Sequence, residues 1–508
     1  MIEFPQVQPS VLAPIGFVAI GAMVVLVGEV VVTRARTFLG RPVTESYVGT
    51  LLAIASIVSL LLAFYVSAVA FASGDTAVFN LGNPMFALDR FSALMTSVLS
   101  LSGALLVALS IGYLAEMRIN HGEYYALLLI ALSGMMFLVG AVDLLSVFLG
   151  VEVMSIPIYV LAGFDRRKLR SNESAIKYFL TGSFASGVLL YGMALLYGVS
   201  GSTSFEAIHA AFDPSNPMAV IGLGLVIVGF SFKISAVPFH QWAPDVYEGA
   251  PSAVTAFMSV AVKAAAFAAL ARFIAGVLGT GVEMLAGVVG VLAVLSMVVG
   301  NVMAVIQDNV KRMLAYSSIA HAGYMLVGLA AGGAAGFSAI VFYLIAYTFM
   351  NLGAFGIVVA LAHRGQDCER IESFAGLARS RPGMAALMTL FMLSLAGIPG
   401  TVGFIAKFNI FIAAIRAEMI WLPVLVALTS VVSVFYYLRI PVLMYMREPA
   451  EEAPRSEIAS GEALVLGFCA LAVLFLGILP NDGSLPVIGL DLPVIDWANA
   501  SVAQFFLD

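Results

Sequence analysis

Runs of about 20 apolar residues recur from the start of this chain almost to its end, and they constrain its fold more than any other feature. An α-helix rises ~1.5 Å per residue, so ~20 residues cross the ~30 Å hydrocarbon layer of a bilayer. Of the 508 residues, 61% are apolar and 11% are charged. A soluble protein carries about 25% charged residues, so the composition excludes a soluble globule. High hydrophobicity with a net charge of only -6 also excludes a disordered chain.

The runs predict an all-α polytopic membrane protein with about fourteen spans, folded as a single membrane domain over residues 1–508. A β-barrel is excluded because its strands alternate apolar and polar residues, whereas these runs are apolar on all sides. The first run follows a segment with Glu3 and no Lys or Arg, which indicates a retained helix rather than a cleaved signal peptide. The predicted spans are 11–33, 47–72, 91–114, 124–142, 144–163, 175–199, 218–238, 252–272, 283–306, 313–332, 336–362, 384–415, 421–446 and 462–480.

Basic residues gather in alternate loops, which predicts the orientation of the chain because cytoplasmic loops carry an excess of Lys and Arg. One set of loops holds Arg34, Arg36, Arg41, Arg118, Arg166, Arg167, Lys168, Arg170, Lys311, Arg312, Arg364, Arg370, Arg379, Arg381, Arg447 and Arg455. The other set holds Arg90, Arg272 and Arg416. Both termini fall with the second set, so both, including the tail 481–508, are expected on the extracytoplasmic side. Loop 239–251 is an exception, because it is predicted to be cytoplasmic and has no basic residue.

Four ionisable residues interrupt the apolar pattern inside predicted spans: Glu152, Lys233, Lys263 and Lys407. Each charge near the bilayer centre costs about 2.5–3.5 kcal/mol, so four facing lipid would cost about 10 kcal/mol. They are therefore expected to face the protein interior, a partner or water. Structural ion pairing is an alternative for all four, and a lysine near a helix end can also extend to the headgroups.

Proton transfer is the chemistry that these residues favour. Burial lowers the pKa of a lysine and a nearby carboxylate raises it again, so a moving carboxylate makes the lysine take up or release a proton. Glu152 with Lys233 would form such a pair, Lys263 would accept the next proton, and Lys407 the one after. His321 lies in the tenth span and could relay protons between Lys263 and Lys407, although a hydrogen-bonded packing histidine explains it equally well.

Helix breakers accompany two of the lysines. Pro238 follows Lys233, and Gly397, Pro399, Gly400 and Gly403 precede Lys407. Proline frees backbone carbonyls that other groups must satisfy, and broken helices mark ion sites in transporters. Spans seven and twelve are therefore predicted to be broken.

Four segments resemble the antiporter-like subunits of respiratory complex I, which are related to Mrp-type sodium/proton antiporters. They are VEVMSIPIYVLAGF at 151–164, FKISAVPFHQWAPDVYEGAPSAVTAFMSVAVKAAAF at 232–267, KRMLAYSSIAHAGYML at 311–326 and LAGIPGTVGFIAKF at 395–408. PDVYEGAP at 244–251 is similar to the N-type subunits of bacterial NADH:quinone oxidoreductase. Lys407 suits the N and L types, and the short tail departs from the L type, which continues in a long lateral helix.

The resemblance implies a fold, roles and partners. Two inverted five-helix repeats, spans 4–8 (124–272) and 9–13 (283–446), would follow three N-terminal helices (11–114) and precede a C-terminal helix (462–480). Glu152 and Lys233 would be the coupling pair, Lys263 the central relay and Lys407 the terminal site, with His321 matching a family histidine. No cofactor or metal is expected in this chain. NADH, FMN, iron–sulfur clusters and quinone would belong to partner subunits, which include another antiporter-like subunit and small membrane subunits in the bacterial inner membrane.

Three other functions stay open at this point. The chain could be an Mrp-type cation/proton antiporter subunit, a scaffolding membrane subunit, or part of a related complex fed by ferredoxin. The DVYEGAP string favours a proton-translocating subunit of NADH:quinone oxidoreductase over the Mrp-type alternative.

Overall fold

The computed structural model describes residues 7–39, 45–80, 82–362, 365, 367–448, 458–478 and 494–506. Arg41, Arg364, Arg455 and the tail segment 479–493, on which part of the predicted orientation rests, lie outside these ranges. The side chains of Arg34 and Arg36 are likewise not described.

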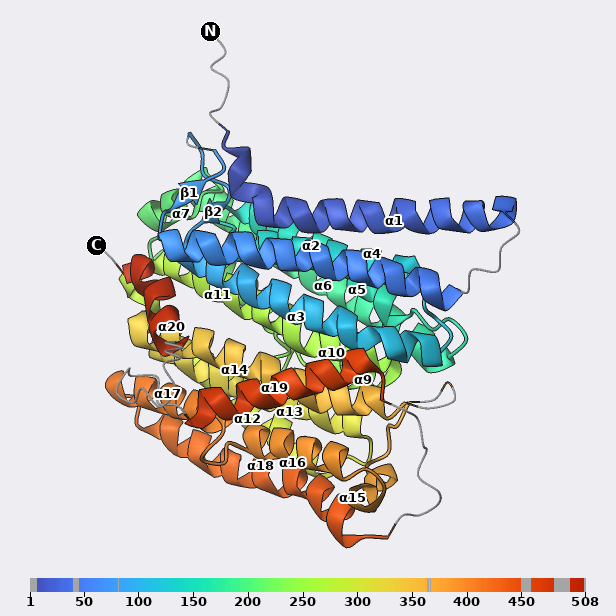
Figure 1. The fold of residues 1–508 in the computed structure, drawn as a ribbon. Helices are drawn as coiled ribbons and strands as arrows, with labels where there is room; N and C mark the ends of the chain where they lie inside the picture. The colour runs from blue at the N-terminus through green and yellow to red at the C-terminus, as the bar shows by residue number, and fades with distance from the viewer. Residues whose placement is uncertain are drawn as a thin grey trace.

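Helices make up nearly all of the described chain (Figure 1). The α-helices are α1 (Ala13–Leu39), α2 (Glu45–Ser73), α3 (Arg90–Glu116), α4 (Gly122–Val139), α5 (Leu144–Ala162), α6 (Leu169–Ser200), α7 (Phe205–Ala211), α8 (Pro217–Lys233), α9 (Trp242–Gly249), α10 (Ser252–Phe257), α11 (Lys263–Leu278), α12 (Ala286–Val305), α13 (Val310–Ala331), α14 (Gly333–Ala360), α15 (Leu377–Ser380), α16 (Pro382–Ala396), α17 (Val402–Arg416), α18 (Trp421–Met446), α19 (Ser460–Ile478) and α20 (Val494–Val502). Short 3-10 turns are η1 (Pro9–Leu12), η3 (Gly279–Leu285), η4 (Ile371–Phe374) and η5 (Ala503–Phe506). The strands β1 (Ala77–Val78) and β2 (Ala87–Leu88) pair antiparallel.

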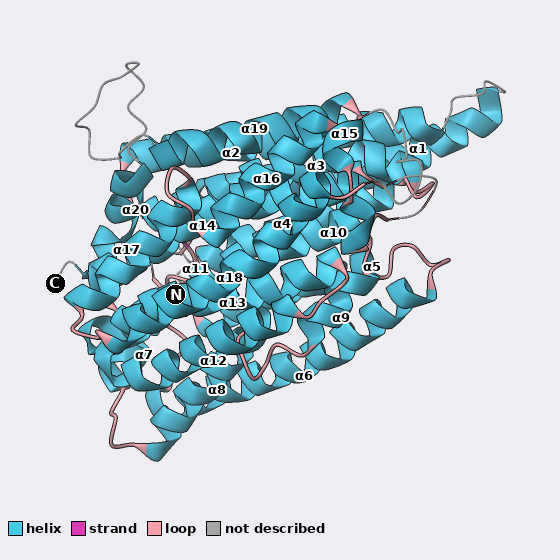
Figure 2. Ribbon diagram, turned by 90° about the horizontal axis from the view of Figure 1, so that it is seen from below, coloured by secondary structure: helices cyan, strands magenta, loops and turns pink. Residues whose placement is uncertain are grey.

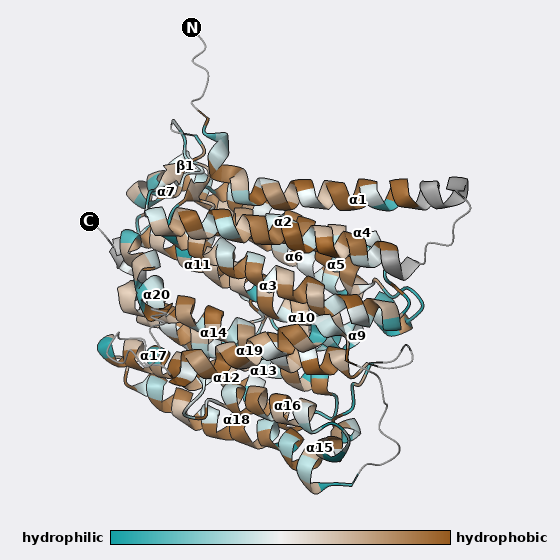
Figure 3. Cartoon of the chain, viewed as in Figure 1, coloured by the Kyte–Doolittle hydropathy of each residue, from teal (hydrophilic) through white to brown (hydrophobic). Residues whose placement is uncertain are grey.

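The long helices lie side by side along one common direction, as both Figure 1 and Figure 2 show. Within the described residues, 12 helices are long and apolar enough to cross a membrane, and α8 and α16 are shorter apolar helices. Apolar residues cover the middle of the bundle and hydrophilic residues gather at its two ends (Figure 3). This is the distribution expected of a helical membrane protein.

Side-chain caps begin several helices where the sequence places Asp or Asn before an apolar run. Asp89 and Ser92 form a reciprocal capping box at the start of α3. Asp143 accepts hydrogen bonds from the N–H groups of Leu145 and Ser146, and Asn309 caps α13 in the same way. The predicted boundary between the fourth and fifth spans at Asp143 is therefore a capped helix start.

The predicted breaks in spans seven and twelve are present, although the helix ends differ from the expected ones. The seventh span was expected to run to residue 238, but α8 ends at Lys233 and α9 begins at Trp242. The single span predicted at 384–415 is two helices, α16 and α17, because Gly397 at φ 85° and Gly400 at φ 87° turn the chain between them.

The two termini of the described chain lie at the same end of the bundle, with α7 and α20, whereas α9 and α15 lie at the other end (Figure 1). We call the end with α9 the basic end. Acidic residues of α9 explain why loop 239–251 needs no Lys or Arg of its own. Asp245 pairs with Lys177 at 2.9 Å and Arg312 at 2.8 Å, and Glu248 pairs with Arg312 at 2.9 Å.

Candidate functional site

Lys233 is the last residue of α8, and its side chain is only 3% exposed. Its Nζ donates to Ser155 Oγ at 2.7 Å and to Tyr159 Oη at 3.3 Å, both on α5. The ammonium also lies 5.5 Å from the centre of the Tyr159 ring and 6.0 Å from that of Tyr178. Because α8 ends here, the amine reaches neutral oxygens and aromatic faces rather than lipid.

Glu152 lies on α5 three residues before Ser155 and seven before Tyr159, so the three side chains share one helix face. Its side chain is partly buried, and its Oε1 atom is buried without a hydrogen-bond partner. No ion pair within 4.0 Å joins Glu152 to Lys233 in the described part of the chain. The Lys233 amine is therefore held by the Ser155 and Tyr159 hydroxyls rather than by the Glu152 carboxylate. An orphaned carboxylate oxygen of this kind calls for a water, an ion or a proton.

Lys263 follows a π-helical turn, η2 (Met258–Val262), in the middle of the α10–α11 helix. Its Nζ, on a side chain 2% exposed, donates to the Ser318 backbone oxygen at 2.5 Å and also to Ser318 Oγ. The amine lies 5.9 Å from the centre of the Tyr347 ring. π-turns are frequent at functional sites, and this one places a lysine at the centre of a helix whose sides are all buried.

His321 on α13 is buried and hydrogen-bonded through both ring nitrogens. Nδ1 lies 2.7 Å from Tyr343 Oη and Nε2 lies 3.0 Å from Tyr437 Oη. The Tyr437 hydroxyl also contacts Ser317 Oγ. The imidazole therefore stands between two phenols that can each donate or accept a proton.

Lys407 lies on α17, one turn after the break, and its side chain is 8% exposed. Its Nζ donates to the Ala396 carbonyl at 2.8 Å, which is at the end of α16 and free because the helix stops there. The amine also lies 4.9 Å from the centre of the Tyr324 ring. The break therefore supplies the oxygen that holds the lysine.

The five predicted site residues fall into two clusters. The first, around Lys233 and Glu152, lies among α5, α6 and α8. The second joins Lys263, His321 and Lys407 through α13: Ser317 and Ser318 are adjacent, the Tyr347 ring lies near both Lys263 and His321, and the Tyr324 ring lies near both His321 and Lys407. Within the described ranges, no hydrogen bond connects the first cluster to the second.

Several polar residues that hold these clusters were not found from the sequence. They are Ser155, Tyr159, Asn301, Tyr343, Tyr347, Tyr436 and Tyr437. The sequence held a weak signal for some of them. Ser155 and Tyr159 follow Glu152 at successive helical intervals of three and four residues, and Tyr343 and Tyr347 are four residues apart inside an apolar span. Tyrosine is common in buried helices, so this spacing alone does not identify a site.

The second cluster gathers an amine, hydroxyls, phenols and an imidazole in one buried region, and these are groups that can pass protons. A chain of groups that each donate and accept can exchange protons through reorientation and bound water. The first cluster adds a carboxylate, which the second lacks among its described contacts.

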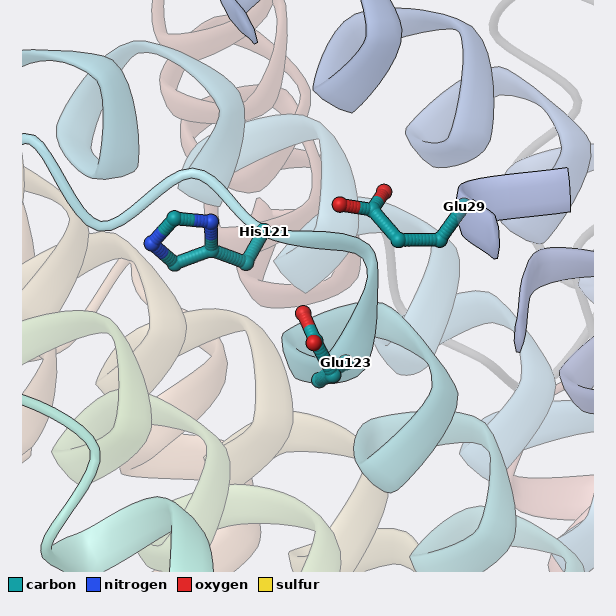
Figure 4. A group of neighbouring side chains, drawn as sticks. All are labelled: Glu29, His121 and Glu123. Carbon is teal, nitrogen blue, oxygen red and sulfur yellow. The ribbon is translucent and has the colours of Figure 1, made fainter. Parts of the chain in front are cut away.

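A separate group of side chains surrounds the start of α4 at the surface (Figure 4). The ligand atoms of Glu29, His121 and Glu123 all lie within 4.8 Å of one another. This grouping was not expected from the sequence, because Glu29 is on α1 and lies far along the chain from the other two. Glu29 Oε2 accepts the N–H of Gly122 at 3.2 Å, so this carboxylate already caps a helix start.

Residues 141–433 match the family described as "NADH:quinone oxidoreductase/Mrp antiporter, TM". The chain is 47% identical over 398 residues to NADH-quinone oxidoreductase subunit N of Trichlorobacter lovleyi, which covers 78% of this chain and 82% of that protein. It is 44% identical over 504 residues to NADH-quinone oxidoreductase subunit N 1 of Sorangium cellulosum, with 95% and 97% coverage.

Solved structures share the fold. A chain of respiratory complex I from Thermus thermophilus with bound aureothin superposes with a TM-score of 0.74 at 33% identity, covering 91% of this chain and 98% of that one. A chain of the Mrp complex from Dietzia sp. superposes with a TM-score of 0.84 at 23% identity, covering 98% of each chain.

Proposed function

This chain belongs to the NADH:quinone oxidoreductase/Mrp antiporter family, in its subunit N branch, and we propose that it moves protons along the two clusters described above. It is an antiporter-like, proton-translocating membrane subunit of NADH:quinone oxidoreductase, or complex I. In that enzyme, this subunit would move charge across the membrane and would not carry out redox chemistry.

In the proposed relay, Glu152 controls the proton affinity of Lys233, Lys263 is the central carrier, His321 passes the proton on and Lys407 is the terminal site. The observation that carries the proposal is a pair of hydrogen-bonded groups around α13, Lys263–Ser318 and Ser317–Tyr437–His321, whose two serines are adjacent in the chain. Each of these contacts joins groups able to exchange a proton, and water would have to bridge the two serines. Water would have to bridge Lys233 to Lys263, since their described contacts do not meet.

Redox events elsewhere in the complex would reach this chain as an electric field or a change of shape. Moving one charge against ~100 mV costs about 2.3 kcal/mol, which a rearrangement of buried charges can supply. A carboxylate that approaches or leaves Lys233 changes the proton affinity of that amine, and the change passes along the relay as electrostatic repulsion.

The proposal also covers the topology, the orientation and the partners of the chain. Counting the two broken helices as crossings gives fourteen, arranged as a three-helix N-terminal part (11–114), two inverted repeats (124–272 and 283–446), a C-terminal helix (462–480) and a tail (481–508). The basic end would face the cytoplasm and both termini would be extracytoplasmic, in the bacterial inner membrane. Neighbours would be another antiporter-like subunit and small membrane subunits, and NADH, FMN, iron–sulfur clusters and quinone would bind to partner subunits.

The test is Lys263→Ala in the whole complex, reconstituted into vesicles. Loss of the central amine should lower proton uptake while the complex still assembles, because the cavity left by a shortened lysine is small compared with the buried core. Normal pumping by assembled Lys263→Ala complex would refute the relay. Copurification in mild detergent with flavin and iron–sulfur subunits separates a complex I subunit from an Mrp-type subunit.

A further inference from the structure

Asp367 is a carboxylate at the basic end that the proposed relay does not use. It lies in the segment between α14 and η4, and its side chain is 6% exposed. Its Oδ1 accepts hydrogen bonds from Tyr113 Oη at 2.8 Å and from Ser252 Oγ at 2.6 Å. Its Oδ2 faces Lys168 Nζ at 3.5 Å. Burial raises the pKa of Asp367, but Lys311, Ser252, Lys168 and Tyr113 outweigh burial and hold this pKa below its usual range.

A cavity of about 270 Å³ opens beside Asp367, and several charged residues line it. Charged and titratable groups face the carboxylate or line this cavity from every neighbouring segment: Tyr113, Asp165, Lys168, Arg170, Glu248, Lys311, Cys368 and Glu369. A cavity of this size has room for several waters, and its charged residues can hold them, so protons from solution would have access to the carboxylate.

Ser252 is the first residue of α10, the helix that leads to Lys263. Thr255, Ser259 and Lys263 follow it at intervals of three or four residues, which places all four on one helix face. At ~1.5 Å per residue they span about 16 Å, so each hydroxyl lies about 5–6 Å from the next, a gap that one water bridges. The face therefore leads from Asp367 to the central lysine.

Orphaned polar groups mark the facing helix, α14. Asn351 is 0% exposed, and its Oδ1 is buried without a hydrogen-bond partner; its side chain and that of Ser318 lie beside the buried Tyr347 hydroxyl, which makes no hydrogen bond of normal geometry. Asn351 lies one turn from Tyr347, whose ring is near the Lys263 amine, and one turn from Phe355, whose ring lies 6.3 Å from that of Tyr247. The Tyr247 backbone oxygen in turn accepts from Thr255 Oγ at 2.9 Å.

A fully buried amide oxygen without a partner is rare in folded proteins, and an ordered water is the usual explanation. Asn351 is one turn from Tyr347, which lies near Lys263, and one turn from Phe355, which lies near Tyr247, so water bound to it would help to bridge the hydroxyl face of α10 and the central lysine. The orphaned atoms thus occur where a proton path from the basic end would need them.

We propose that Asp367 collects protons at the basic end and that a hydrated track past Ser252, Asn351 and Tyr347 delivers them to Lys263. The ionised carboxylate takes a proton from hydronium in the cavity and becomes a carboxylic acid. That acid then returns to a carboxylate as its proton passes through water to the neutral Lys263 amine, which becomes an ammonium. The inference rests on the proposed role of Lys263 as a proton carrier.

The experiment compares Asp367→Asn, Asp367→Glu and Glu372→Gln complexes in vesicles, with proton uptake measured per NADH oxidised from pH 6 to 9. Glu372 is a matched control because it is a carboxylate of the next segment whose side chain is 76% exposed. Asp367→Asn should lower proton uptake about tenfold at alkaline pH, where hydronium is scarce, and less at acid pH. Asp367→Glu and Glu372→Gln should keep the parent profile.

Asn351→Leu tests the track if Asp367→Asn fails to assemble. Leucine has a similar size and binds no water, so uptake should fall, whereas Asn351→Ser should retain it because serine keeps a polar group and room for water. A Lys263→Ala reference separates the two levels of the argument. If Asp367→Asn and Asn351→Leu take up protons like the parent while Lys263→Ala does not pump, this inference alone is overturned. Parent-like uptake in Lys263→Ala would overturn the relay as well. A defect in Asp367→Asn that does not vary with pH would indicate a structural role and also contradict the inference.

Discussion

Each of the two broken spans carries a buried lysine near its break, but the two lysines are held by different groups. Lys233 ends the helix before its break, and its amine meets hydroxyls on α5 with the Glu152 carboxylate one turn further along. Lys407 follows its break, and its amine meets a backbone carbonyl that the break itself has freed, together with an aromatic face. Only the first site has a carboxylate close by in the described part of the chain.

This difference indicates different tasks for the two sites. A lysine beside a carboxylate changes its proton affinity when that carboxylate moves, so it can respond to a signal from outside the subunit. A lysine that faces only neutral groups responds to the arrival of another positive charge, and repulsion from a newly protonated neighbour favours release. The Lys233 site is suited to control, and the Lys407 site is suited to release.

The largest effect should follow from Lys233→Ala. Loss of the controlling amine leaves Glu152 without its cation and removes the first carrier, so proton uptake per NADH should fall roughly 100-fold. Uptake in vesicles and the amount of assembled complex are the measurements. Lys177→Ala is a matched control, because that lysine pairs with Glu173 and Asp245 at the basic end. If Lys233→Ala pumps as well as this control, the first cluster is structural.

Glu152→Gln should have a smaller effect, about tenfold on uptake, since it removes the charge and keeps the shape. Double variants show which of the two lysines Glu152 acts through. Glu152→Gln should add little to Lys233→Ala, because both act on one site, and should add its full effect to Lys407→Ala. Additivity with both lysines would show that Glu152 does not act through Lys233.

Tyr437→Phe should lower uptake about threefold to tenfold, because it deletes the hydroxyl that joins Ser317 to His321 while water can partly replace it. Tyr125→Phe is the control, since its buried hydroxyl binds Asn120 and no residue of the second cluster. Equal effects of the two substitutions would place the proton path elsewhere in the second cluster.

Much of this arrangement was predictable from the sequence, and the limits have a physical cause. An ionisable residue inside a long apolar run is costly unless it faces the interior, so Lys233, Lys263 and Lys407 could be identified without a structure. Glycine and proline beside two of them predicted the breaks. The uncharged partners could not be predicted in this way, because a serine or tyrosine in a membrane helix costs little and gives no comparable signal.

Contacts between distant segments were the second limit. Asp367 appeared to be an ordinary loop residue, and only the packing of α3, α10 and α14 places it against Tyr113 and Ser252. The missing ion pair between Glu152 and Lys233 is of the same kind. The order of residues predicted that the two would be close, but it did not predict that the Lys233 amine would donate to Ser155 and Tyr159 instead.

Ser155→Ala should have the smallest effect, and it is the most direct test of how the Lys233 amine is held. Lys233 donates to Ser155 Oγ at 2.7 Å, and one such hydrogen bond to a charged group contributes about 1.5–3 kcal/mol. Without it the amine loses a neutral acceptor, and the nearest alternative of opposite charge is Glu152. Tighter pairing should hold the proton on Lys233, so uptake should fall a few-fold. Tyr159→Phe removes the longer contact, at 3.3 Å, and should act in the same direction. If Ser155→Ala instead raised uptake, the Ser155 hydrogen bond would slow proton release from Lys233, and the proposed role of Ser155 in keeping Lys233 from pairing tightly with Glu152 would be wrong.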